Sequence, residues 1–513
     1  MSPEPRELPV RLVLRRLRDE AKSRKRSGEF ATLAEAQYTV AREYGFASWP
    51  RLKIFVQTRS ADVSARAAAL VRSACSSNLR IARTLLEAEP DLARYGLATA
   101  CVTGEAAEVA RLLGRDPEAV HRKLPPLDWE PLLYACFSRF LRADPVRTRG
   151  IVEIVRLLLA AGADPNVYWM HDEFRQLPVY GAAGIANNPE LTRMLLDAGA
   201  DPNETYEDPE TVGEALYHAV EFPDPTCARM LIEAGTSPTD VSHCLGRALN
   251  FPNPAMIEMM LACGAVPHGN HLLQAVYNRR PLSIVAVLLD AGAPVDKSND
   301  HGMTPLRVAV AWGRDDLARL LTDRGADQSR VTAADRSLGA ALSGSPLSAE
   351  PAPTAAAGTT AASATNTQPD ERVLNDLLGW AVMEGDAASV SRLLAAGAPI
   401  DGLPDSEFPP LAQAAWRGRA EVAHVLVDHG AALRWGDGGS AMGATLHGSV
   451  HCHHPEGGPT MKTVDEVTHG EYGQLIRFFA ELGQPIPEYL EGVRELDVPM
   501  LLDRLGVQLP DRS

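Results

Sequence analysis

The densest group of metal-ligating residue types in the chain lies between Leu446 and Gly458, in the sequence LHGSVHCHHPEGG. His447 and His451 are four residues apart, a spacing that places both imidazoles on one face of a helix. Imidazole and thiolate groups are ligands that zinc and nickel accept. No second ligand pair follows at the spacing of a zinc finger, so a site here needs further ligands from the fold. The candidate metal ligands are His447, His451, Cys452, His453 and His454.

Sequence signatures of catalysis are missing or out of context. The chain has no Walker A motif, no H-E-x-x-H and no G-x-S-x-G. The run from Gly436 to Ala441 fits G-x-G-x-x-A, but we expect it to follow a loop and not a strand of a βαβ unit. Carboxylates are dispersed without a recognisable acid and base pair. We therefore expect no enzymatic activity, no catalytic residue and no cofactor.

One sequence pattern recurs along most of the chain. It is clearest between Asp296 and Gln328, in DKSNDHGMTPLRVAVAWGRDDLARLLTDRGADQ. A glycine, usually followed by alanine, returns after a leucine-rich helix end in steps of 37, 36, 29, 28, 33, 72 and 33 residues. The spacing predicts a repeat of about 33 residues. The glycines are Gly162, Gly199, Gly235, Gly264, Gly292, Gly325, Gly397 and Gly430.

Each position of the repeat has a physical role. Thr304 can accept a backbone N–H at the start of a first helix, and Pro305 follows where no N–H partner is needed. Gly313 permits the tight turn to a second helix, whose apolar stripe includes Leu317. Gly325 supplies the positive φ that ends the second helix. One such unit cannot bury its own apolar face, so the units must stack.

The same segment resembles the ankyrin repeat, in Gly302, Thr304-Pro305-Leu306, Ala309, Gly313 and Gly325-Ala326-Asp327. Arg307 departs from the family, which usually has histidine there. The resemblance implies an all-α solenoid of stacked helix-turn-helix units with extended, β-hairpin-like loops between repeats. It also aligns Leu446-His447 with the Pro-Leu-His of the family, whose histidine is structural. A structural His447 in a polar loop is therefore the alternative to a metal site, and we favour it.

Composition divides the repeats into two blocks. Residues 335–370 are rich in Ala, Pro, Ser and Thr, with almost no large apolar side chain after Leu347, so we expect a disordered linker. Stacking of the blocks across this linker stays open. The predicted domains are a basic helical cap or extension (1–60), a solenoid of about eight repeats (61–334), the linker (335–370), a second block of about three repeats (371–485) and a C-terminal helical cap (486–513).

The N-terminus is a separate electrostatic unit. Residues 1–60 contain 13 Lys and Arg against 7 Asp and Glu, a net charge of +6, so the other 453 residues carry −22 to give the total of −16. The sequence predicts helices over residues 9–24, 33–44 and 49–57. Thr32 and Glu35 form a capping box for the second of these.

Two interpretations of this basic segment stay open. Two helices joined by a glycine turn could form a helix-turn-helix that binds nucleic acid. Against this, Arg51 occupies a position that is usually apolar in that motif, and Trp49 and Leu52 are committed to packing. We favour a cap on the first repeat, which a solenoid needs. Residues 33–56, LAEAQYTVAREYGFASWPRLKIFV, resemble the N-terminal extension of many bacterial ankyrin-repeat proteins, which implies a bacterial source.

The resemblance implies that a protein partner binds to loop tips and to the concave face of the inner helices. The loop after Pro165, NVYWMHDEFRQLP, is longer than its neighbours and has the aromatic, Met and Arg composition of interface hot spots. Alternatively, this loop folds over the insertion between Ala135 and Ile151 and buries its rings. The candidate partner-binding residues are Tyr168, Trp169, Met170, His171, Phe174 and Arg175, with Tyr206, Trp312 and Trp416 as weaker candidates that could equally pack on the next unit.

Cysteine usage favours a reducing compartment. The seven cysteines are scattered without a C-x-x-C pair, several at positions that other repeats fill with Ala or Leu, so we expect reduced core thiols. There is no apolar run of about 18 residues and no signal peptide, and we expect a cytoplasmic protein. The function we expect is a non-catalytic, monomeric scaffold or adaptor for an unidentified protein. The alternative is a regulator that uses the His-rich loop at 447–454 or the basic N-terminus.

Overall fold

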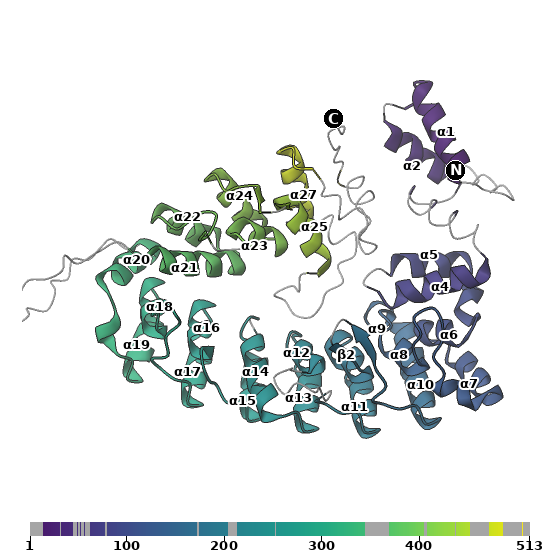
Figure 1. Ribbon diagram of the computed structural model, residues 1–513, viewed down its shortest axis with the longest axis horizontal. Helices are drawn as coiled ribbons and strands as arrows, with labels where there is room; N and C mark the ends of the chain where they lie inside the picture. Colours follow the sequence, from purple (N-terminus) through teal and green to yellow (C-terminus); the bar gives the residue numbers. More distant parts are fainter. Residues whose placement is uncertain are drawn as a thin grey trace, which may run out of the picture. The chain divides into compact units, whose positions relative to one another are not determined.

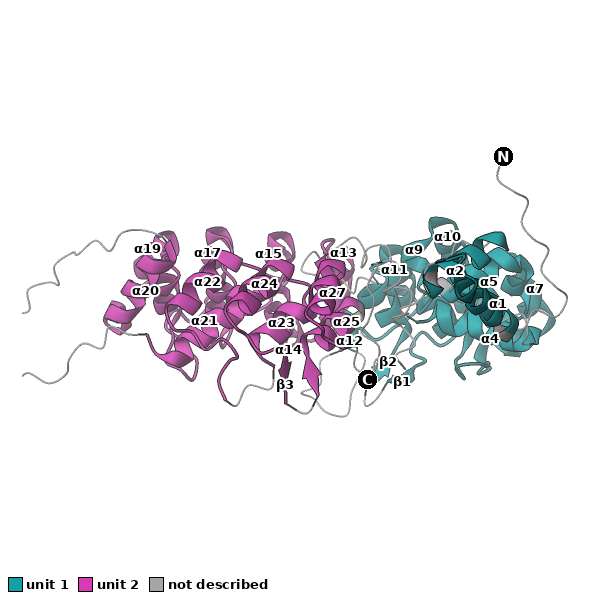
Figure 2. Cartoon of the chain, turned by 90° about the horizontal axis from the view of Figure 1, so that it is seen from above, with its two compact units in different colours: residues 1–215, 494–506 teal, residues 216–493, 507–513 magenta. Residues whose placement is uncertain are grey.

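The structure is a computed structural model built almost entirely of helices (Figure 1). Contacts divide the chain into two compact units, one of residues 1–215 and 494–506 and the other of residues 216–493 and 507–513 (Figure 2). The predicted all-α solenoid is confirmed. The structure describes residues 14–30, 32–44, 49, 52, 56, 62–76, 79–171, 174–203, 213–251, 253–343, 369–404, 408–436, 438–451, 471–485 and 505.

The repeat at residues 296–328 folds as its sequence predicts. Thr304 Oγ1 accepts a hydrogen bond of 3.3 Å from the Arg307 N–H and caps α18 (Pro305–Ala311). Gly313, with φ of 67°, makes the turn into α19 (Asp315–Asp323), and Gly325, with φ of 90°, ends that helix. Only a residue without a side chain adopts these backbone angles at little cost. The sequence pattern therefore fixes both ends of the helix pair.

Loops of successive repeats are tied to each other by side chains. Asn166 Nδ2 donates to the Gly199 carbonyl at 3.0 Å, and Asn166 Oδ1 accepts from the Asp201 N–H at 2.7 Å. Asp296 Oδ1 plays the same part toward the Asp327 N–H at 3.0 Å. These bonds satisfy backbone groups that helices and strands leave unpaired. Each loop is thereby positioned by the repeat next to it.

The first unit begins with a basic helix, α1, and a second helix, α2, which share a core of their own. Glu35 N–H donates to Thr32 Oγ1 and Thr32 N–H to Glu35 Oε2, so the predicted capping box is confirmed. The third predicted helix lies mostly outside the described residues, although Leu52 and Val56 are buried in this core. The elements of the first unit are α1 (Leu14–Arg26), α2 (Leu33–Glu43), α4 (Val63–Ala74), α5 (Arg80–Ala88), α6 (Leu97–Thr103), α7 (Ala106–Arg115), α8 (Pro131–Cys136), α9 (Phe140–Ala143), α10 (Pro145–Ala160), β1 (Trp169–His171), β2 (Phe174–Gln176), the π-helix η3 (Tyr180–Ile185) and α11 (Pro189–Asp197), with 3-10 turns η1 (Pro90–Arg94) and η2 (Pro117–His121).

Helix α12 begins in the first unit and ends in the second. The second unit consists of further helix pairs. Its elements are α12 (Glu214–Ala219), α13 (Thr226–Glu233), α14 (Pro238–Ala248), α15 (Pro254–Ala262), α16 (His271–Tyr277), α17 (Leu282–Asp290), α18, α19, η4 (Gln328–Arg330), α20 (Ala333–Ser343), α21 (Glu371–Glu384), α22 (Ala387–Ala395), α23 (Pro410–Trp416), α24 (Ala420–Asp428), β3 (Arg434–Trp435), β4 (Gly439–Ser440), α25 (Ala441–His451) and α27 (Glu471–Glu481).

The start of the predicted linker is folded. Residues 335–343 belong to α20, where Leu338 and Leu342 are buried, so the prediction of disorder is wrong for these nine residues. The physical reason is an ion pair that composition does not reveal: Arg307 donates to both carboxylate oxygens of Asp335, at 2.9 and 3.1 Å. Asp370, at the other end of the predicted linker, caps α21. Residues 344–368 and most of the predicted C-terminal cap lie outside the described residues.

Candidate partner-binding site

The aromatic loop after Pro165 forms a short antiparallel hairpin. β1 pairs with β2 so that Trp169 lies opposite Gln176, Met170 opposite Arg175 and His171 opposite Phe174. Paired residues of an antiparallel ladder project to the same face, and neighbours along a strand project to opposite faces. The loop therefore has two faces with different roles.

The inner face of the hairpin is anchored by Trp169. Its indole lies 4.7 Å from that of Trp129, which is 8% exposed, and meets the edge of Phe137 at 5.8 Å. Phe137 in turn meets the edge of Tyr180 at 6.0 Å. Aromatic pairs at such distances stabilise beyond the area that they bury. The alternative of packing over the insertion between Ala135 and Ile151 is therefore correct for Trp169.

The outer face presents Tyr168, Met170 and Arg175. Tyr168 is 45% exposed and Met170 is 50% exposed, which is high for apolar side chains of their size. The Arg175 guanidinium lies 5.0 Å from the centre of the Tyr168 ring, a cation–π distance. These side chains lie on one face of the hairpin, and Trp169 anchors the opposite face. His171 is exposed and Phe174 is half-buried at the end of the hairpin.

Trp129 was not predicted to belong to this site. It precedes α8 in a loop that the bridge between Leu124 and Trp129 closes. The Tyr134 hydroxyl pins the same loop, because it donates to the Leu124 carbonyl at 2.6 Å and accepts from the Leu127 N–H at 3.0 Å. The sequence marks Trp129 only as a tryptophan in an irregular segment and does not pair it with Trp169. That pairing depends on the stacking of two repeats.

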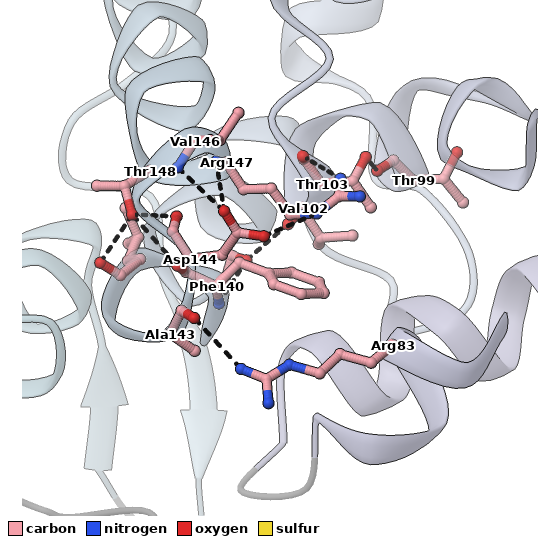
Figure 3. Close-up of polar contacts among 12 residues, drawn as sticks. Arg83, Thr99, Val102, Thr103, Phe140, Ala143, Asp144, Val146, Arg147 and Thr148 are labelled. Atoms are coloured by element: carbon pink, nitrogen blue, oxygen red, sulfur yellow. Dashed lines mark hydrogen bonds and ion pairs between the residues drawn. The ribbon is translucent and has the colours of Figure 1, made fainter. Parts of the chain in front are cut away.

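The insertion beneath the hairpin is fixed to the preceding repeats by polar contacts (Figure 3). Asp144 caps α10 by accepting from the Val146 and Arg147 N–H groups at 3.0 and 3.1 Å. Arg147 Nη1 donates to the Thr103 carbonyl at 2.8 Å, and Arg83 Nη2 donates to the Ala143 carbonyl at 3.3 Å. α9 and α10 are thus tied to α5 and α6. The insertion that contains Phe137 is thereby held against the preceding repeats.

The weaker partner candidates pack within the chain. Trp312 is 6% exposed, and the Arg279 guanidinium lies 3.9 Å from its ring centre. Trp416 stacks on His447 at 4.8 Å and meets the edge of Phe408 at 6.2 Å. Both tryptophans pack on a neighbouring repeat. Tyr206 lies outside the described residues.

The His-rich segment is only partly described. His447 lies in α25, where its ring stacks on Trp416 with an interplanar angle of 27°. His451 ends the helix, and Cys452, His453 and His454 lie outside the described residues. Within the described part of the chain, no group of three or more His, Cys, Asp or Glu side chains is arranged to hold a metal ion. The predicted metal site stays a prediction.

Acidic side chains accept hydrogen bonds from Arg24 in the basic N-terminal segment. Arg24 donates to both oxygens of Glu43, at 2.6 and 2.8 Å, and to Glu20 at 2.9 Å. The hydrogen bond that Arg24 donates to Glu43 is the main cause that raises the pKa of Arg24. This guanidinium ties α1 to α2 and is directed to Glu43 and Glu20 rather than to a phosphate. Nucleic-acid binding gains no support here.

Two further sequence signals have structural outcomes. The run at 436–441 follows β3, so the expectation that no strand precedes it is wrong, but β3 pairs with β4 in an antiparallel hairpin that lacks the parallel strands of a dinucleotide site. The six described cysteines are free thiols. Burial raises the pKa of Cys101, Cys136 and Cys244, as expected of core thiols. Across the described residues, no helix has the length and apolarity needed to cross a bilayer.

Comparison with protein families agrees with the repeat pattern in part of the chain. Residues 245–332 match the family model of ankyrin repeats in three copies. A solved structure similar to this chain is the ankyrin repeat domain of Bcl-3, titled a unique member of the IkappaB protein family, at 27% identity over 39% of this chain and 88% of that chain, with a TM-score of 0.31. No curated protein matches. Ankyrin repeats are generally protein–protein interaction modules. Residues 245–332 thus match ankyrin repeats, and the helix pairs before and after them continue the same arrangement.

Proposed function

We propose that the chain is a non-catalytic adaptor that binds a protein partner, and that the outer face of the hairpin at 168–176 is part of its binding surface. The observation that carries the proposal is the exposure of Tyr168 and Met170, at 45% and 50%, on a hairpin whose Trp169 is anchored beneath them. Tyrosine, methionine and arginine are enriched at interfaces, and rigid aromatic anchors dominate their energetics.

Preorganisation supports this assignment. A mobile loop loses conformational entropy when a partner orders it, and that loss weakens binding. Here the contact of Trp169 with Trp129 and the hydrogen bonds of the strand pair already order the hairpin. The exposed side chains can therefore contribute their full contact area to a complex. In this proposal the stacked repeats hold the hairpin in place, and the exposed side chains of the hairpin select the partner.

The cellular setting is part of the same proposal. Six free cysteines, of which Cys101, Cys136, Cys227 and Cys244 are buried, favour a reducing compartment such as the cytoplasm. The resemblance of residues 33–56 to bacterial N-terminal extensions favours a bacterial cell. We propose a monomeric cytoplasmic protein in which partner binding is the activity.

Affinity capture from cell lysate tests the proposal. The test variant carries Tyr168→Ser and Met170→Ser, which remove exposed side chains and leave Trp169 in place. The control is Val146→Ser, because Val146 is 69% exposed on α10, away from the strand pair. We expect a protein that the wild-type and control chains retain to be lost from the double variant, since hot-spot truncations cost about 2 kcal/mol or more each. Equal retention by all three would refute the assignment of the hairpin.

A further inference from the structure

The second repeat block lies against the inner helices of the first within one compact unit. α21 and α22 lie beside α16, α18 and α20 (Figure 1), although residues 344–368 separate them in sequence. Arg392, in α22, donates to the Leu342 carbonyl of α20. The sequence left open whether the two blocks stack across the linker, and these helices of the two blocks do pack against each other.

One face of α21 makes a regular series of contacts with the first block. Asp376, Trp380 and Glu384 are spaced at four residues, so they line one side of the helix. Asp376 Oδ2 lies 2.8 Å from His301 Nδ1 and accepts from Asn299 Nδ2 at 3.2 Å. These contacts fix the N-terminal half of α21 against the loop between α17 and α18.

The C-terminal half of α21 contacts the opposite end of the inner helices. The Trp380 ring stacks on Tyr277 at 5.5 Å with an interplanar angle of 19°. Glu384 Oε1 accepts from Arg280 Nη2 at 2.8 Å, in the turn that follows α16. α21 therefore spans the inner face from the loop to the turn. On an ankyrin solenoid that face is the concave surface.

Arg279 extends the contact to α22. Its guanidinium pairs with Asp386 and donates to Ser389 Oγ at 2.8 Å, while it covers the Trp312 ring at 3.9 Å. Hydrogen bonds from Ser389 and Arg279 lower the pKa of Asp386, although burial acts against them. The cationic side of the contact belongs to the first block, and the anionic side belongs to the second.

The receiving surface is also held by contacts within the first block. Arg280 is 4% exposed, and its Nε donates to the Leu249 carbonyl at 3.0 Å. Asn278 Nδ2 donates to the same carbonyl at 2.8 Å. The neighbouring repeat thus holds the turn that presents Arg279 and Arg280. Helix α21 also contacts α22 and α23 of its own block. Its buried residues are Val373, Leu374, Leu377, Leu378, Ala381 and Val382, and none of them makes the polar or ring contacts with the first block described above.

We infer that this surface, made of Tyr277, Arg279, Arg280, Asn299 and His301, is a docking site for an acidic helix with an aromatic residue between two carboxylates, and that α21 occupies it as an internal ligand. A partner protein that presents a helix of the same pattern takes its place. Charge complementarity and the one-sided contact face of α21 carry the inference. It rests on the proposed function only in that the chain binds proteins, and it concerns a surface other than the hairpin.

Helix α21 and the helix of a partner protein compete for the same surface. The internal helix is tethered, so its effective concentration at the surface is high and a free helix competes poorly with it. The contact is polar, and contacts of this kind resemble transient interfaces more than fold cores. Weakening the α21 side should therefore open the surface to an external helix. Binding that rises when the internal contact is damaged is the signature of an internal ligand.

Fluorescence anisotropy with a labelled peptide of residues 371–397 tests the inference on the intact chain. The opened variant carries Asp376→Lys and Glu384→Arg. The control, Glu258→Lys, reverses one exposed charge on α15. We expect the opened variant to bind the peptide about tenfold or more tightly than the wild-type and control chains. A peptide with Asp376, Trp380 and Glu384 replaced by alanine should lose that gain.

Each other outcome overturns the inference. Equal affinity of the wild-type and opened chains would show that α21 does not occlude a helix-binding surface, and unchanged binding of the alanine peptide would show nonspecific adhesion. Should the charge-reversed variant unfold at a lower temperature than the control, Asp376→Asn with Glu384→Gln removes the charges and keeps the side-chain sizes. Light scattering that finds wild-type dimers, separated by these substitutions, would assign the site to a second copy of the chain and exclude a different partner. Failure of the hairpin capture experiment leaves this test unaffected.

Discussion

The indoles of Trp169 and Trp129 lie 4.7 Å apart, and this contact divides the hairpin at 168–176 into an anchored face and a displayed face. Without Trp129, Trp169 would lose its nearest aromatic partner and keep the edge contact with the buried Phe137 at 5.8 Å. With it, Trp169 is held and Tyr168 and Met170 remain exposed. An aromatic loop can either pack within the protein or present its side chains to a partner. Here Trp169 packs within the protein, and its two neighbours in sequence, Tyr168 and Met170, are exposed.

Helix α20 should not tolerate a side chain at Gly339. A Cβ there would lie 2.0 Å from the Val310 carbonyl oxygen of α18, so the two inner helices would have to separate. We expect Gly339→Ala to lower the free energy of unfolding by about 1–3 kcal/mol. Gly379→Ala in α21 is the matched control, because its Cβ would meet nothing within 4 Å and should stabilise the helix by about 0.5–1 kcal/mol. Denaturant titration measures both, and a loss of stability in both would contradict the close approach at Gly339.

His271 should make the second unit sensitive to mild acid. Burial, followed by the charges of His268 and His243, lowers the pKa of His271 from 6.5 to about 4. Between these values the unfolded chain binds the proton and the folded chain does not, so the free energy of unfolding falls as the pH falls from about 6.5 toward 4. We expect a contribution of at most a few kcal/mol. Thermal unfolding across this range should show a shallower dependence for His271→Gln than for the wild type.

An exposed histidine provides the control position. His429 is the C-cap residue of α24 at the surface, and His429→Gln tests whether replacing any histidine gives the same change as His271→Gln. An unchanged slope in His271→Gln would mean that other groups set the acid sensitivity.

The ion pair between Arg307 and Asp335 should hold α20 in place. Asp335 is 3% exposed and also accepts from the Thr332 N–H at 2.8 Å. We expect Asp335→Ala to cost about 1–3 kcal/mol, because it leaves the half-buried Arg307 guanidinium without its charge partner. Asp323→Ala at the exposed end of α19 should be nearly neutral. Hydrogen exchange at α20 measures the local effect, and equal protection in both variants would show that the pair is dispensable.

Much of the fold could be predicted because each repeat is specified by nearby residues. Thr304, Gly313 and Gly325 act through the backbone of their own unit, and their capping and turn geometry is confirmed. The capping box of Thr32 and Glu35 is equally local. Such signals need no knowledge of the neighbouring repeats.

The remaining features depend on contacts between residues distant in sequence. Composition marks residues 335–343 as linker, and the partner that stabilises their helix, Arg307, lies in the repeat before. The stacking of Trp380 on Tyr277 and the contact of Trp169 with Trp129 likewise depend on how repeats pack against each other. The β-hairpin-like loops that the resemblance implied are consistent with an exposed Tyr168 beside a half-buried Trp169, but the sequence does not give the strand register that decides which residues face inward.

The most direct test of the adaptor account is site-specific photo-crosslinking in the native cell. A photoreactive amino acid replaces Met170 on the displayed face of the hairpin, and in a matched chain it replaces Val146, which is also apolar and highly exposed. We expect irradiation to join the Met170 chain, and not the Val146 chain, to one discrete protein that mass spectrometry identifies. Identical products from both positions, or none from Met170, would contradict the claim that this face of the hairpin binds a partner.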